Sequence, residues 1–152
     1  MRRASRVRRV VYRDGPRRVV VRAALVLSLF CTTLQLDPTW VLRVIDGDTF
    51  VIRNAGITNT EGVRVCQTID GAKAVCVNTP ETDAADPAQK LQAAAATVFA
   101  EEWLMAGPFT LAACQRDSFG RLLGVVTRGD SNLGQSLLDS GHAVLYKRKQ
   151  KS

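Results

Sequence analysis

The sequence predicts a mainly β domain with helices (α+β), built as an OB-fold: a five-stranded Greek-key barrel in the order β-β-β-α-β-β-α. Short runs rich in branched residues alternate with turn signals, which is typical of strands. One long helical stretch follows the third strand and a short one follows the fifth, which is the order of an OB-type barrel. The 152 residues, of which 46% are apolar, suffice for one domain with a core.

The strands of the first half surround a short acidic turn. They are predicted from their β-prone composition at residues 40–45, 49–53, 63–66 and 72–77. Asp46-Gly47-Asp48 is expected to reverse the chain, with Gly47 as the residue that permits the turn. A polar loop occupies residues 54–62.

The main helix is expected to begin at Asp86-Pro87, an N-cap residue followed by proline at the first helical position. Gly107-Pro108 ends it. Its buried face is expected to be one broad apolar stripe: Leu91, Ala95, Val98, Phe99 and Trp103.

Two strands and a second helix complete the predicted domain. The strands cover residues 109–114 and 122–126, joined by a polar loop. The second helix runs from about Asn132 to Ser140, and Gly141 caps its end. Its inward-facing residues are expected to be Leu133, Leu137 and Leu138.

Positive charge gathers at the two ends of the chain. The formal net charge is +7, yet residues 1–36 carry nine arginines and one acid, which gives +8. Residues 37–152 hold 12 Lys or Arg against 13 Asp or Glu, which gives −1, and their dense basic cluster lies at residues 147–151. The high pI therefore does not by itself indicate a DNA-binding domain.

Residues 1–36 are expected to be an Arg-rich leader, and residues 37–152 the domain. The apolar run at residues 23–31 has the length of a signal-peptide core and is short for a membrane span. Arg17-Arg18 would suit a twin-arginine export route. Three alternatives stay open: a cleaved signal, an uncleaved anchor in the membrane, or a start codon placed too far upstream. We favour export, to a secreted or membrane-anchored extracytoplasmic location; the third alternative implies the cytoplasm.

The four cysteines do not form a zinc motif, since the chain has no C-x-x-C pair and one histidine. Cys66 and Cys76 flank Asp70-Gly71, a strong hairpin signal, and a three-residue loop would set them opposite each other. In an exported protein they would form a disulfide. As free thiols they would be small buried hydrophobes. Both alternatives are open.

Three short stretches contain the residues suited to chemistry: VIDGDT at 44–49, VNTPET at 77–82 and DSFGR at 117–121. A phosphodiesterase needs cations at the phosphoryl oxygens and a base to activate water, and carboxylate ligands select Ca²⁺ or Mg²⁺. In this order, over about residues 39–146, the stretches resemble the staphylococcal nuclease-like (thermonuclease) family. The family pattern reads roughly DGDT, then R-x-x-x-x-D-T-P-E, then D-x-x-G-R.

The resemblance implies a Ca²⁺ site at the acidic turn. Asp48 would be a direct ligand, Asp46 would lie close by through water, and Thr79 would offer its backbone carbonyl. The family aspartate before Thr-Pro-Glu is Asn78 here. Its amide oxygen can still bind the metal, but one negative charge is lost, so Ca²⁺ is expected to bind more weakly.

The resemblance also implies the catalytic and substrate-binding residues. Glu81 would be the general base, and Arg121 would hold the phosphate and stabilise the transition state. The family arginine five residues before Asn78 falls on Lys73, which lacks the bidentate fork. Arg64 would take this role instead if the hairpin of Cys66 and Cys76 is an insertion. Two aromatic residues are expected to bind bases by stacking: Phe119, at a position that is often tyrosine, and Tyr146.

Two functions are therefore expected. The first is a monomeric Ca²⁺-dependent endonuclease that hydrolyses DNA and RNA with little sequence preference, favouring single-stranded or frayed regions. The alternative is an OB-fold module that binds nucleic acid with weak or no cleavage, motivated by Asn78 and Lys73. Glu81 and Arg121 favour the enzyme, because a pure binder needs neither.

Overall fold

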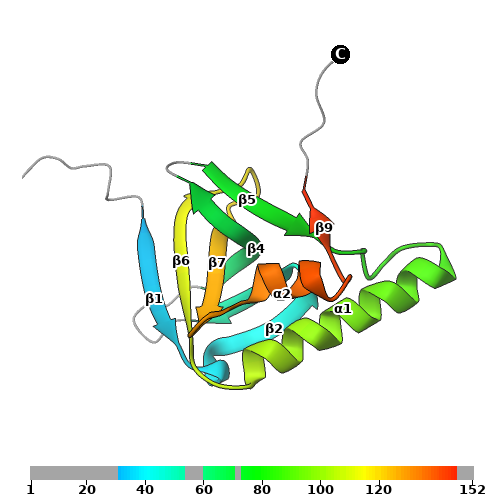
Figure 1. The fold of residues 1–152 in the computed structure, drawn as a ribbon, viewed down its shortest axis with the longest axis horizontal. Coiled ribbons are helices and arrows are strands. Elements are labelled where there is room, and N and C mark those ends of the chain that lie inside the picture. The colour runs from blue at the N-terminus through cyan, green and yellow to red at the C-terminus, as the bar shows by residue number, and fades with distance from the viewer. Residues whose placement is uncertain (1–30, 54–59, 71–72, 147–152) are drawn as a thin grey trace, which may run out of the picture. The chain divides into compact units, whose positions relative to one another are not determined.

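The computed structural model describes residues 31–53, 60–70 and 73–146 (Figure 1). The chain divides into two units, Met1–Cys31 and Thr32–Ser152, and all described strands and helices belong to the second. The predicted leader core, the turn at Gly71 and the C-terminal basic cluster lie outside the described residues. Within the described residues, no helix is both long and apolar enough to cross a membrane.

The described strands form one mixed sheet. Its hydrogen-bonded path runs β1-β6-β7-β4-β3-β2, with β5 paired to β4, β8 to β7 and β9 to β5. β4 and β7 are parallel. The strands are β1 Thr32–Leu36, β2 Val41–Asp46, β3 Thr49–Arg53, β4 Thr60–Asp70, β5 Lys73–Asn78, β6 Phe109–Arg116, β7 Leu122–Arg128, β8 Ser131–Asn132 and β9 Val144–Leu145.

The predicted α+β fold class is confirmed. Two helices, α1 Pro87–Met105 and α2 Leu133–Asp139, accompany the sheet, and a short 3₁₀ helix covers Pro38–Trp40. The predicted order β-β-β-α-β-β-α is found in β2, β3, β4, α1, β6, β7 and α2, with β5 inserted between β4 and α1 as the hairpin partner of β4 (Figure 1). The remaining strands extend this framework at its edges.

β1 lies inside the segment that was assigned to the leader. It pairs antiparallel with β6, from Thr32 opposite Ala113 to Leu36 opposite Phe109. Leu36 is 1% exposed and belongs to the hydrophobic core. The described sheet therefore begins five residues before the predicted boundary at residue 37.

α1 begins as predicted, but its buried face was predicted only in part: Phe99 and Trp103 pack against the core, whereas Leu91 and Val98 do not. Asp86 caps the helix by accepting a hydrogen bond from the backbone N–H of Ala88 at 3.0 Å. Leu91 is 74% exposed and Val98 49% exposed. The buried residues are Ala93, Ala96, Ala100 and Leu104. The three alanines let α1 approach β2 and the turn after it closely, since even a Cβ at Gly47 would lie 2.9 Å from Cβ of Ala96. Close approach therefore selects small residues for this part of the face.

α2 matches its prediction closely. Asn132 caps it by accepting a hydrogen bond from the backbone N–H of Gln135 at 3.1 Å. Leu133 and Leu137 are fully buried, and Leu138 packs against the core. Gly141 has a φ of 79°, the left-handed conformation that ends helices.

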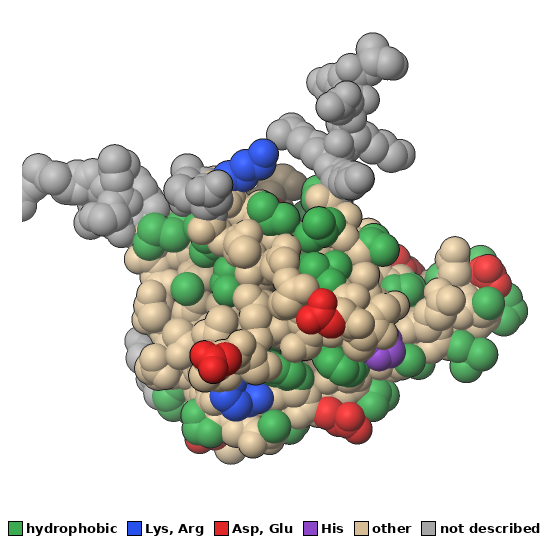
Figure 2. Space-filling model, in the orientation of Figure 1, with side chains coloured by type: hydrophobic (Ala, Val, Ile, Leu, Met, Phe, Trp, Pro, Cys, Tyr) green, Lys and Arg blue, Asp and Glu red, His purple; other side chains and the backbone are tan. Residues whose placement is uncertain are grey.

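Charged side chains are sparse and scattered on the face shown in Figure 2, where hydrophobic and neutral groups cover most of the surface. This face shows no dense group of Lys and Arg among the described residues. The distribution fits the near-neutral charge of residues 37–152.

Candidate active site

The acidic turn between β2 and β3 is buried. Asp46 is 8% exposed and Asp48 3% exposed. Asp48 accepts hydrogen bonds from the Thr49 hydroxyl at 2.8 Å and from the Thr79 backbone N–H at 2.9 Å. Asp46 accepts one from the backbone N–H of Thr82 at 3.1 Å. These bonds hold the loop after β5 against the turn.

Gly47 is required for close packing rather than for an unusual backbone conformation. The described glycines with positive φ are Gly120, Gly129 and Gly141, so Gly47 does not need the left-handed region. A Cβ at Gly47 would lie 2.9 Å from Cβ of Ala96 and 2.9 Å from Cγ2 of Thr79. Beyond the predicted turn, the missing side chain of Gly47 lets α1 and the Thr79 loop approach.

Gly47→Ala is expected to lower the free energy of unfolding by about 1–3 kcal/mol, the usual cost of overpacking. The inserted methyl group would also meet the backbone carbon of Ala96 at 3.1 Å, which cannot rotate away. Urea denaturation would measure the loss. Gly107→Ala is the control, since its added Cβ would lie 3.7 Å from the nearest atom, Nε of Arg128. Equal midpoints for both variants would contradict the packing argument.

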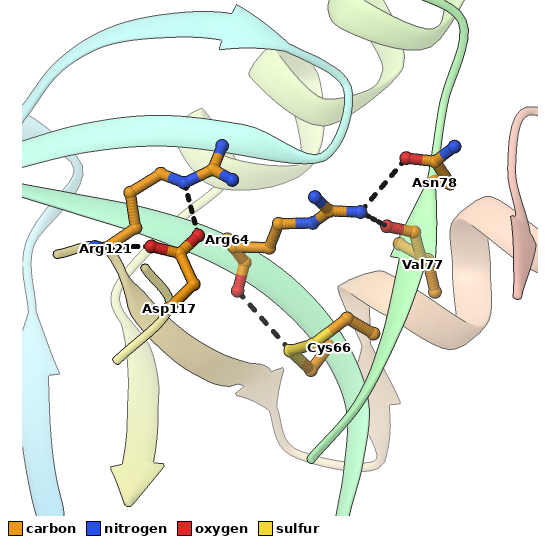
Figure 3. The surroundings of a disulfide bond; sticks show 7 residues. Arg64, Cys66, Val77, Asn78, Asp117 and Arg121 are labelled. Atoms are coloured by element: carbon orange, nitrogen blue, oxygen red, sulfur yellow. Dashed lines mark hydrogen bonds and ion pairs between the residues drawn. A yellow bond between two sulfur atoms is a disulfide. The ribbon is translucent and has the colours of Figure 1, made fainter. Parts of the chain in front are cut away.

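Asp117 orients Arg121 through two hydrogen bonds. Its Nε donates to Asp117 Oδ2 at 2.7 Å, and its backbone N–H donates to Oδ1 at 2.9 Å (Figure 3). Burial alone would raise the pKa of Asp117, but hydrogen bonds from Arg121 and from the backbone N–H of Phe119 lower it. Asp117 is thus an anionic support, and Nη1 of Arg121 reaches Thr49 Oγ1 at 3.4 Å.

Arg64 approaches the turn from β4. Its Nη2 donates to the Val77 carbonyl and to Asn78 Oδ1, each at 3.0 Å (Figure 3). Its guanidinium carbon lies 5.0 Å from the ring centroid of Tyr146. The oxygen of Asn78 that was expected to bind a metal therefore accepts from Arg64 in this structure.

One cavity of about 360 Å³ gathers most of the residues singled out from the sequence. Its lining consists of Asp46, Asp48, Thr49, Arg64, Glu81, Phe119 and Arg121. A neighbouring cavity of about 540 Å³ is also lined by Arg64, Phe119 and Arg121, together with Lys73 and Tyr146. Lys73 thus lies on the hairpin side of the site, whereas Arg64 faces the acids.

Asn78 and Thr79 fall outside the lining of the 360 Å³ cavity. They line a separate hollow of about 390 Å³, to which Glu81 also contributes. Thr79 still adjoins the acids through its bond to Asp48, and its buried hydroxyl has no hydrogen-bond partner among the described residues.

Glu81 is exposed at the edge of this arrangement. Its partial burial, followed by repulsion from Asp46, Asp48 and Asp83, raises its pKa above the ordinary value for glutamate. A carboxylate with a raised pKa that shares a cavity with Arg64 and Arg121 suits proton transfer near a bound anion.

The donors at the turn fit a hard cation. In residues 31–53, 60–70 and 73–146, no three His, Cys, Asp or Glu side chains form a metal-binding cluster by themselves. Asp46 and Asp48 nevertheless are buried with hydrogen bonds from uncharged donors, and within the described residues neither forms a salt bridge. Two such carboxylates are oxygen donors of the kind that Ca²⁺ prefers, and the backbone of Thr79 adjoins one of them.

Comparison with known families adds to this geometry. The model of the family described as staphylococcal nuclease homologue matches residues 73–152. The chain belongs to the staphylococcal nuclease family. No curated protein matches it. The matched stretch of this staphylococcal nuclease homologue contains Glu81 and Arg121, while Asp46, Asp48 and Arg64 precede it. The fold brings both groups to one cavity.

Two supporting residues were not singled out from the sequence. Thr49 links Asp48 to Arg121, and Asp117 orients Arg121. Both stand inside the quoted stretches DGDT and DSFGR, so their proximity to the predicted site was the available signal. The spacing of residues along the sequence does not show which side chains form hydrogen bonds with each other in the fold.

Proposed function

We propose that this staphylococcal nuclease homologue is a Ca²⁺-dependent endonuclease that hydrolyses DNA and RNA with little sequence preference. The observation that carries the proposal is the single cavity shared by two buried carboxylates, a carboxylate with a raised pKa, and two arginines. Family membership supports a nuclease-like hydrolase.

Each residue has a role that its position supports. Glu81 takes a proton from the attacking water. Arg121 and Arg64 hold oxygens of the scissile phosphate, and Arg64 replaces Lys73 in this role because it faces the acids. Asp46, Asp48 and the Thr79 carbonyl would hold Ca²⁺, which neutralises charge at a phosphoryl oxygen.

Base contacts come from two exposed rings. Phe119 is 83% exposed and Tyr146 51% exposed, and both line the cavity of about 540 Å³. Stacking on aromatic side chains tolerates every base, which suits cleavage without sequence preference. It also requires unstacked bases, which supports a preference for single-stranded or frayed regions.

The full chain tests this function. Plasmid DNA, single-stranded DNA and RNA would be incubated with it in Ca²⁺ or in chelator, and product ends would be analysed. We expect cleavage in Ca²⁺, loss of cleavage in chelator, and 3′-phosphate ends. Asp48→Asn is the matched variant, since it keeps the side-chain volume and removes one charge; it should need more Ca²⁺. Cleavage that persists unchanged in chelator would overturn the cation's role, and no cleavage in Ca²⁺ would overturn the enzyme.

A nucleic-acid-binding module remains the second candidate, favoured by one observation. The Asn78 amide oxygen accepts from Arg64 and the residue carries no charge, so the turn keeps two buried acids. In this candidate the protein binds single strands through Phe119 and Tyr146 in Ca²⁺ but leaves them intact.

Asn78→Asp is expected to lower the Ca²⁺ concentration that gives half-maximal cleavage. The substitution restores a negative charge beside Asp48 and Glu81, and charge strengthens cation binding. A Ca²⁺ titration of initial cleavage rates measures it. Unchanged Ca²⁺ dependence would show that Asn78 acts on Arg64 alone.

We further propose that the protein acts outside the cytoplasm, secreted or held at the membrane by its N-terminal segment. The disulfide between Cys66 and Cys76 supports this, because disulfides persist in oxidising compartments. Mass spectrometry of the secreted fraction would find the chain there. Recovery of intact Met1 only in the cytosol would contradict export.

A further inference from the structure

The β4–β5 hairpin ends in a disulfide at the side that faces the active site. Cys66 and Cys76 are paired in the ladder and joined through their sulfurs. Cys66 is 0% exposed and Cys76 8% exposed. The described ladder runs from Asp70 opposite Lys73 to Cys66 opposite Cys76, so the disulfide closes its last pair.

A register shift weakens the ladder next to this pair. Between Cys66 and Thr68 the pairing slips by one residue, because Cys66 faces Cys76 while Thr68 faces Val75. The predicted loop lies outside the described residues, but the bulge shows that the register on either side of it is not continuous. A bulge leaves one residue unpaired and bends the strand. The covalent bond therefore fixes the strand separation where the hydrogen bonds are interrupted.

Arg64 spans the two strands immediately beyond the disulfide. It stands two residues before Cys66, and both of its acceptors, Val77 and Asn78, follow Cys76 (Figure 3). The Arg64 carbonyl oxygen lies 3.6 Å from the sulfur of Cys66. Nε of Arg64 is buried without a hydrogen-bond partner in the described residues, so the guanidinium depends on the two bonds of Nη2 for its orientation by hydrogen bonding.

The disulfide-bonded Cys76 also helps to place the Tyr146 ring, which lies against the Arg64 guanidinium. The backbone N–H of Tyr146 donates to the Cys76 carbonyl at 2.9 Å, and β9 pairs with Val77 and Asn78. The Tyr146 ring then lies 5.0 Å from the Arg64 guanidinium carbon. Movement of β5 away from β4 would shift both the acceptors and the aromatic support of Arg64.

We propose that the Cys66–Cys76 disulfide is a positioning element for Arg64, which holds its guanidinium in the orientation that binds substrate phosphate. The proposal rests on the proposed nuclease function of the site. A disulfide that only stabilised the fold would leave the affinity for substrate unchanged. Here, loss of the disulfide lets β4 and β5 separate at the bulge. The Val77 carbonyl and Asn78 Oδ1 then move away from Arg64, and its guanidinium is no longer held in one orientation.

The test is the double variant Cys66→Ala/Cys76→Ala in the full chain, with Cys31 and Cys114 left unchanged. We expect KM for single-stranded DNA to rise by about tenfold, with kcat reduced less, since misplacing a substrate-binding group by about 1 Å can cost up to 10²-fold. In an Arg64→Ala background, removing the disulfide should raise KM no further. Equal KM rises in both backgrounds would overturn the proposal.

Ile69→Ala is the matched control. Ile69 lies half-buried in the same hairpin, opposite Ala74, and the substitution keeps the disulfide while removing β-branched apolar volume from β4. It should lower Tm and leave KM unchanged. If KM rose in both the double cysteine variant and Ile69→Ala in proportion to the fall in Tm, the disulfide would act only through the stability of the fold.

A second readout does not need activity. The side-chain N–H protons of Arg64 should be resolved by NMR and exchange slowly in the native protein, because two acceptors hold Nη2. They should exchange rapidly in the double cysteine variant at a temperature where it is folded. Unchanged exchange would reject positioning. Absence of all cleavage would reject the nuclease function instead, so the two failures are distinguishable.

Discussion

Glu81→Gln is expected to reduce kcat for DNA cleavage by about 10²–10⁴-fold, the contribution of a positioned general base. The amide has the volume of the carboxylate but cannot accept the proton of the attacking water. A base must be deprotonated, so the raised pKa of Glu81 places the acid limb of the native pH–rate profile above the usual glutamate range. The variant should lose that limb.

Single-turnover cleavage and oligonucleotide binding, measured together, separate chemistry from affinity. Binding should be retained, since Glu81 is not among the residues that hold phosphate or bases. Glu61→Gln is the control: this carboxylate pairs with Arg116 at 2.6 Å and does not line the cavity of about 360 Å³. A Glu81→Gln variant as active as the Glu61→Gln variant would remove Glu81 from the mechanism.

Arg121→Lys is expected to lower kcat by about 10²–10³-fold, the range for losing one donor at a developing charge. Lysine keeps the positive charge but loses the planar fork and the hydrogen bond from Nε to Asp117. Its ammonium group is therefore no longer held over the cavity. KM should change less than kcat, because the charge that attracts the substrate remains.

Steady-state kinetics with Arg53→Lys as control would measure this. Arg53 is exposed at the end of β3 and lines none of the cavities described above. If Arg121→Lys raised KM with kcat unchanged, Arg121 would bind the ground state alone and would not stabilise the transition state.

The predictions that held depend on local signals. Asp86-Pro87 and Asn132 begin helices because their side chains or ring act within one turn, and both helices start there. The acids of the turn, Glu81 and Arg121 could be singled out because each stands in a short stretch of fixed spacing; the structure brings them to one cavity, and their roles stay predictions. Helix starts and short motifs of this kind can be recognised in a sequence without knowing the fold.

The features that the sequence could not settle depend on contacts between distant segments. Lys73 matches the family spacing to Asn78, whereas Arg64, the alternative, stands fourteen residues before Asn78 and donates a hydrogen bond to it. Leu91 and Val98 were expected to be buried, yet alanines face the sheet because α1 lies close to β2. β1 looked like part of the leader because its role depends on β6, some 75 residues later.

The contact between Gly47 and Ala96 links the motion of two elements. With no side chain between them, a displacement of the acidic turn must be shared by the middle of α1. A ligand that binds only the ordered turn stabilises that arrangement by mass action, and it restrains the helix at the same time. Backbone amides around Ala96 should then exchange more slowly with solvent when the site is occupied. α1 lines none of the 360 Å³ cavity, yet its exchange rate would report the occupancy of that cavity.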